Sequence, residues 1–72
     1  MNVTASYREL RSRAQEANSK PALEYLKAKG DEIQRQCSSP ELHPKYRRQA
    51  LKQNLLLRRA IIRREKQLRK MR

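Results

Sequence analysis

Three stretches of the chain repeat apolar residues at the period of an α-helix, every three or four positions. The first stretch carries Tyr7, Leu10, Ala14 and Ala17. The second carries Leu23, Leu26, Ile33 and Cys37. Together with a third stretch after Pro44, this pattern predicts helices over roughly 5–18, 20–36 and 44–71.

Helix boundaries are marked by few residues, since the chain has one glycine and three prolines. Ser6 and Glu9 have the spacing of a capping box, which predicts the start of the first helix. Pro21 and Pro44 suit the first turns of the next two helices, because proline lacks an N–H. Gly30 could end the second helix as a left-handed cap or lie inside it where another helix approaches closely. We favour a continuous helix, weakened or kinked there.

The last stretch carries two apolar lines. The first is a heptad-like seam, which is typical of a helix that packs on another helix. Its apolar residues are Tyr46, Ala50, Leu57, Ile61, Leu68 and Met71, and the polar residues Asn54 and Arg64 lie on the same line. The second, shorter line consists of Leu51, Leu55 and Ile62, and suits a helix with more than one neighbour. The residues predicted to contact a partner helix are Leu51, Leu55, Leu57, Ile61, Ile62 and Leu68.

We therefore expect an all-α protein in which two short helices pack on one long basic C-terminal helix, as a partial bundle or helical hairpin. The expected contact layer is Leu10, Leu23, Leu26, Ile33, Leu57 and Ile61. The core should be marginal, because only 36% of the 72 residues are hydrophobic and a chain this short buries little surface. Tyr7 and Tyr46 fall on apolar stripes and should pack inside, whereas Tyr25 is the better candidate for contacting a partner.

Charge divides the chain into two segments. Residues 1–42, the two shorter helices, are near neutral, with seven basic and six acidic residues. Residues 43–72, the long amphipathic helix, hold twelve basic residues and one acid, and so carry almost all of the net charge of +12. Such asymmetry predicts a basic element that meets a polyanion.

Seven cations share one edge of the last helix, within about 60° at 3.6 residues per turn. We name this set the cationic row: Lys45, Arg48, Lys52, Arg59, Arg63, Lys66 and Lys70. Neighbouring arginines and lysines in the pairs 47–48, 58–59, 63–64 and 69–70 are expected to widen it. A charge run is often only a solvated face, but solubility surfaces mix both signs and like charges four residues apart repel.

The cationic row predicts nucleic-acid binding, since lysine and arginine neutralise phosphates. We favour RNA over DNA because arginine-rich helices recognise RNA largely by shape and phosphate contacts. The predicted function is a non-enzymatic structural role in a ribonucleoprotein such as a ribosome, among other proteins of a larger assembly. Neither a catalytic cluster, a glycine-rich phosphate loop nor a metal-ligand set is expected, and Cys37 with His43 alone would not complete a zinc site. We expect no cofactor and no small-molecule substrate.

A protein–protein module is the alternative, in which the Leu55–Leu57 and Ile61–Ile62 cluster docks on an acidic partner or a second copy. It would be a regulator of transcription machinery, a phage-type inhibitor or an assembly adaptor. A membrane-surface helix ranks last, because interfacial Trp and Phe are absent. A single cysteine and no secretory signal pattern favour a reducing compartment, either the cytoplasm or a nucleoid or organelle matrix, without secretion.

Two resemblances are visible. The short, very basic helical chain is similar in composition to many small ribosomal proteins. The tripeptide Ser6-Tyr7-Arg8 resembles the Leu-Tyr-Arg signature of small basic mitochondrial three-helix adaptors, which would imply a three-helix fold. Here Ser6 stands in place of the leucine, and the chain has no phenylalanine to follow the signature downstream.

Overall fold

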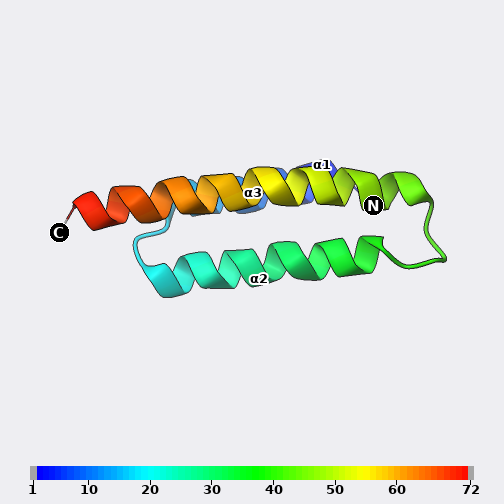
Figure 1. Ribbon diagram of the computed structural model, residues 1–72, viewed down its shortest axis with the longest axis horizontal. Helices are drawn as coiled ribbons and strands as arrows, with labels where there is room; N and C mark the ends of the chain where they lie inside the picture. The colour runs from blue at the N-terminus through cyan, green and yellow to red at the C-terminus, as the bar shows by residue number, and fades with distance from the viewer. Residues whose placement is uncertain (1, 72) are drawn as a thin grey trace.

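The computed structural model describes residues 2–71, which form three helices and no strand. They are α1 (Val3–Glu16), α2 (Lys20–Cys37) and α3 (Pro44–Lys70). In Figure 1, α2 runs antiparallel to α1 and α3, and the described chain is a slender bundle of 46 × 16 × 14 Å. Helix α3 contacts both other helices more extensively than they contact each other. The predicted architecture, two shorter helices packed on a long C-terminal helix, is confirmed.

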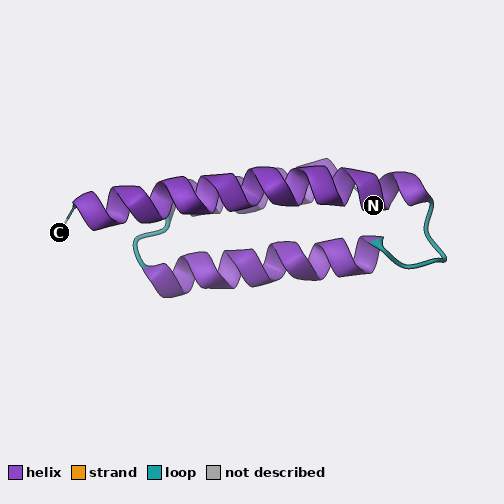
Figure 2. Cartoon of the chain, in the orientation of Figure 1, coloured by secondary structure: helices purple, strands orange, loops and turns teal. Residues whose placement is uncertain are grey.

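Short loops connect the helices, as the ribbon coloured by secondary structure shows (Figure 2). Pro21 and Pro44 each lie in the first turn of a helix, as expected. The capping box predicted at Ser6 is wrong, because α1 begins one turn earlier. The Asn2 side chain caps it by accepting a hydrogen bond from the Ala5 amide (3.0 Å). Ser6 lies inside the helix, and its hydroxyl donates to the Asn2 carbonyl (3.1 Å).

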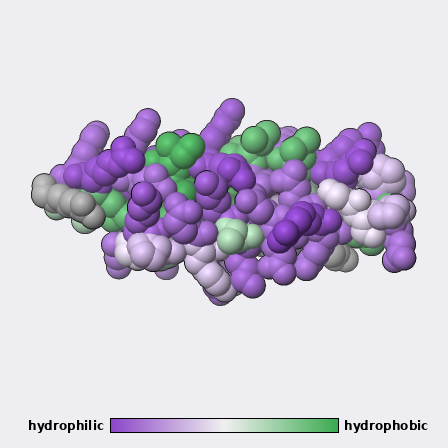
Figure 3. Space-filling model, turned by 60° about the horizontal axis from the view of Figure 1, so that its bottom comes forward, coloured by the Kyte–Doolittle hydropathy of each residue, from purple (hydrophilic) through white to green (hydrophobic). Residues whose placement is uncertain are grey.

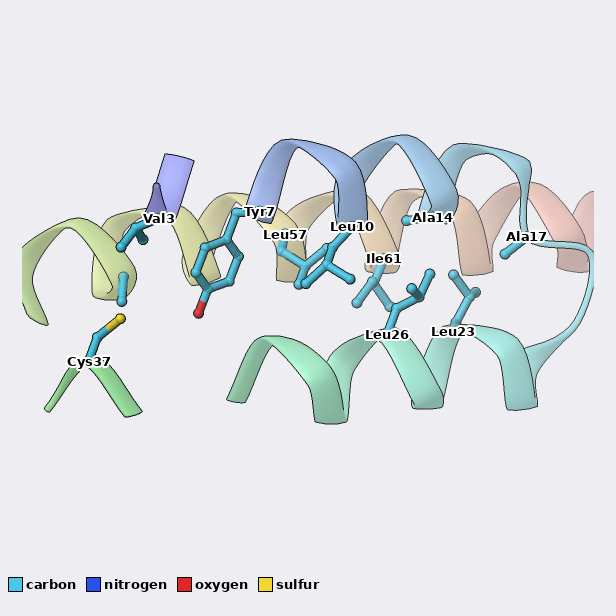
Figure 4. Packing of buried hydrophobic residues seen from close by; sticks show 11 residues of the cluster. Val3, Tyr7, Leu10, Ala14, Ala17, Leu23, Leu26, Cys37, Leu57 and Ile61 are labelled. Atoms are coloured by element: carbon cyan, nitrogen blue, oxygen red, sulfur yellow. The ribbon is translucent and has the colours of Figure 1, made fainter. Parts of the chain in front are cut away.

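The core is a cluster of mainly aliphatic side chains, together with Tyr7, between the three helices (Figure 4). Five of the six residues expected in the contact layer are buried, and Ile33 is partly buried at the edge of the cluster. The buried hydrophobic residues are Val3, Tyr7, Leu10, Ala14, Ala17, Leu23, Leu26, Cys37, Ala50, Leu57 and Ile61. The seam of α3 ends at the partly buried Leu68, whereas Met71, predicted to continue it, is 72% exposed.

Gly30 lies inside α2, which continues through it without a positive φ, so backbone conformation does not require a glycine there. The requirement is space. A Cβ on Gly30 would lie 2.5 Å from Asn54 Oδ1 and 2.6 Å from Leu57 Cδ2. The Tyr7 hydroxyl donates a hydrogen bond of 2.6 Å to the Gly30 carbonyl. Residues of α1 and α3 therefore approach α2 closely at Gly30, which is the second of the two roles considered for this residue.

Because the Tyr7 hydroxyl is buried, the bundle should become less stable at alkaline pH. Burial, followed by the charges of Cys37 and Asp31, raises the pKa of Tyr7 from 10.0 to about 12. Because this folded-state pKa is raised, the stability that Tyr7 contributes is complete below about pH 10 and is lost as pH rises towards 12.

Replacing Tyr7 by phenylalanine is expected to lower the free energy of unfolding by about 1 kcal/mol at pH 7, because one buried hydrogen bond is lost. The difference between the two proteins should shrink above pH 10, where only the wild type must ionise a buried phenol. Urea titrations at pH 7, 9 and 11 measure it. A difference that stays constant with pH would contradict the role given to the Tyr7 hydroxyl.

Candidate nucleic-acid interface

The cationic row follows the outer side of α3, opposite the seam that packs on the other helices. All seven of its side chains are exposed. Within residues 2–71 none of them forms an ion pair, although Lys45 Nζ lies 5.2 Å from the centre of the Tyr46 ring. Hydrophilic groups dominate the face drawn in Figure 3. The row thus offers charged groups that no acid in the described chain neutralises.

Two further arginines of α3 do not widen the row, contrary to the sequence-based expectation. Arg64 turns towards the C-terminal end of α1, where its Nε donates to the Ala17 carbonyl (2.8 Å) and its NH2 nitrogen to Asn18 Oδ1 (3.4 Å). Ala17 is the C-cap of α1, so Arg64 satisfies one of the carbonyls that a helix end leaves without a partner. Arg58 turns towards α2 and binds Asp31 (2.7 Å). Both side chains hold the bundle together.

Asp31 joins α2 to α3 through a small polar network. Its Oδ1 accepts from Asn54 Nδ2 (3.1 Å) and from Arg58 NH2 (2.7 Å), while Asn54 Nδ2 also donates to Gln34 Oε1 (2.7 Å). The hydrogen bond from Asn54, then the hydrogen bond and charge of Arg58, hold the pKa of Asp31 below its usual value. Asn54 itself is buried, and its Oδ1 faces Gly30 without a hydrogen-bond partner. This network fixes how α3 is rotated against α2, and so which way the cationic row faces.

The six residues predicted to contact a partner helix fall into two groups. Leu57 and Ile61 are buried in the core and Leu68 packs against it, so they contact α1 and α2 of the same chain. Leu51, Leu55 and Ile62 are 51%, 56% and 52% exposed. We name these three the apolar ridge. The part of the cluster that includes Leu57 and Ile61 is thus unavailable to a second protein in this fold.

The remaining polar candidates serve the helices. The His43 ring caps α3, since its Nδ1 accepts from the Lys45 amide (3.1 Å), and Cys37 is buried in the core. Among residues 2–71 no three potential metal-binding side chains come together. No helix in the same range is long and apolar enough to cross a bilayer. Tyr25, the tyrosine expected to face a partner, is 57% exposed, with Lys29 Nζ 5.7 Å from its ring centre.

Known proteins offer no guide to this interface, because no protein-family model, curated protein or solved structure matches the chain. What sequence reasoning missed is the inward turn of Arg58 and Arg64. Arg64 carried a signal, since it lies on the seam between Ile61 and Leu68. For Arg58 the signal is absent from its own helix, because its partner Asp31 belongs to α2.

Proposed function

We propose that the protein binds RNA through the cationic row and acts as a non-enzymatic structural component of a ribonucleoprotein such as a ribosome. The observation that carries this proposal is the continuous exposure of seven unneutralised cations along one side of a helix. From Lys45 to Lys70 the row spans about 37 Å at 1.5 Å per residue. The row is therefore long enough to contact several successive phosphates.

The arrangement of the helices favours phosphate tracking over the reading of bases. A helix-turn-helix protein crosses two helices at a steep angle and places one in the major groove. Here all three helices run side by side, and α3 packs against both others while its ends extend beyond them (Figure 1). A straight basic edge of this kind suits the closely spaced phosphates of folded RNA, whose deep major groove side chains do not read.

Salt dependence of RNA binding tests the proposal. If most of the row contacts phosphates, affinity should fall by about 10³-fold or more between 50 and 200 mM salt, as for other proteins with six to ten phosphate contacts. Fluorescence anisotropy with a labelled RNA hairpin measures this, with a DNA duplex of matched sequence and polyglutamate as competitors. We expect RNA to bind more tightly than DNA, and polyglutamate to compete poorly. The proposal would be overturned if polyglutamate competed as well as RNA. It would also be overturned if the dependence of affinity on salt corresponded to only one or two phosphate contacts.

A further inference from the structure

The apolar ridge is an exposed line of aliphatic side chains on a helix that is otherwise strongly basic. Single exposed leucines are common on protein surfaces, but contiguous apolar positions mark interaction sites. Leu51 and Leu55 are four residues apart and Ile62 follows seven residues later, so all three lie within about 40° on α3. Figure 3 shows hydrophobic groups exposed on a mainly hydrophilic face. The ridge extends over about 17 Å, or three helical turns.

Cations border this ridge on both sides. Positions three or four residues away are the neighbours of a side chain on a helix surface. For the three ridge residues these neighbours include one acid, Glu65, and six cations: Arg47, Arg48, Lys52, Arg58, Arg59 and Lys66. Of these six cations, Arg58 is the one that forms an ion pair within residues 2–71, with Asp31. The surface thus combines an apolar line with a positive border.

We propose that the apolar ridge is the docking surface for one acidic amphipathic helix of a partner protein. Leucine-like residues of that helix would cover Leu51, Leu55 and Ile62, and its flanking carboxylates would lie near the bordering cations. Helices with an apolar face commonly bind in this way, with anchors spaced at three, four and seven residues. Opposite charges around the apolar contact would select this partner and accelerate its encounter.

Charge also argues against the other occupants of the ridge. A second copy of the chain would bring two surfaces of the same sign together, and each chain carries a net charge of +12. Nucleic acid gains little from aliphatic side chains, because bases stack on aromatic rings or guanidinium planes. The ridge therefore needs a partner that is both apolar and acidic.

Two synthetic peptides of about 15 residues test this inference, each long enough to cover three turns. One places leucines on one face and glutamates beside them, and the other scrambles the same composition. At about 0.15 M salt we expect wild-type protein to bind the amphipathic peptide at least about tenfold more tightly than the scrambled one. The variant Leu55→Ser with Ile62→Ser should lose that preference. Equal binding of both peptides, or no binding, would reject the proposal.

A matched control changes two exposed apolar residues of the C-terminal helix outside the ridge, Leu56→Ser with Met71→Ser, and should keep the preference. The ridge variant should bind the RNA hairpin within about twofold of wild type, which separates this inference from the proposed RNA function. Should the ridge variant unfold, amide NMR shifts of wild type on adding peptide decide the question. Shifts that include Leu51, Leu55 and Ile62 support it, and shifts confined to the residues of the cationic row refute it.

Two further measurements test whether the ridge instead binds a second copy of the chain or a membrane surface. Sedimentation equilibrium of the wild type should show a monomer, and a dimer that the ridge variant abolishes would assign the ridge to a second copy. Vesicles of phosphatidylcholine with one-third phosphatidylserine should bind wild type and ridge variant alike. Vesicle binding that requires Leu55 and Ile62 would assign the ridge to a membrane surface, and either result overturns the proposal.

Discussion

Replacing Arg59 and Arg63 together by glutamate is expected to weaken binding of the RNA hairpin by about 100-fold at about 0.1 M salt. Each substitution removes one cation from the middle of the cationic row and places a negative charge against the phosphates. The dependence of affinity on salt should become less steep by about two contacts. Anisotropy titrations at three salt concentrations give both quantities.

The fold should survive this change, since both side chains are exposed and neither forms an ion pair within residues 2–71. Circular dichroism checks that helicity is retained. The control is Arg8→Glu with Arg35→Glu, which alters net charge equally but at exposed positions of α1 and α2. We expect the control to weaken binding by no more than about fivefold. Equal losses in both variants would mean that net charge, and not the row, determines affinity.

Replacing Gly30 by alanine is expected to destabilise the bundle by about 2 kcal/mol. At an exposed helix position the same change would stabilise by about 1 kcal/mol, because alanine is the better helix former. At Gly30 the added methyl group would overlap Asn54 Oδ1 and Leu57 Cδ2. Neither can move aside freely, since two hydrogen bonds hold Asn54 and Leu57 is fully buried. The sign of the change is therefore diagnostic, and urea denaturation at pH 7 measures it.

A double-mutant cycle with Asn54→Ala separates overlap from other effects of the substitution. In the Asn54→Ala background, Gly30→Ala should cost about 1 kcal/mol less than in wild type, because half of the overlap is gone. An unchanged cost would place the strain elsewhere. A gain in stability from Gly30→Ala alone would show that α2 and α3 lie further apart than this structure places them.

The packing of α3 on the other two helices has to offset repulsion among the charges of α3 itself. Helix α3 carries like charges four residues apart at 48 and 52, 59 and 63, and 66 and 70, and these repel one another along the helix. Packing of its seam on α1 and α2 offsets that repulsion and keeps the helix extended. Bound phosphates would relieve the repulsion further, so RNA at concentrations above its dissociation constant should raise the melting temperature.

Local sequence patterns were sufficient to predict the three helices, the seam and the cationic row. A helix repeats every 3.6 residues, so the spacing of Leu57, Ile61 and Leu68 places them on one face without knowledge of any partner. The same arithmetic places the row on the opposite face. The start of α1 was missed because Ser6 and Glu9 matched a capping pattern, although Asn2 is an equally suitable capping residue one turn earlier.

Tertiary structure decided which of the two apolar lines of α3 is covered and which arginines remain exposed. Periodicity shows that Leu57 and Leu55 lie on different faces, but both are leucines, and only the position of α1 and α2 buries one and exposes the other. Arg58 and Arg59 lie on adjacent sides of α3, and the position of Asp31 on α2 decides that Arg58 forms an ion pair. A helix determines its own faces from its sequence, whereas the neighbour that covers a face comes from distant parts of the chain.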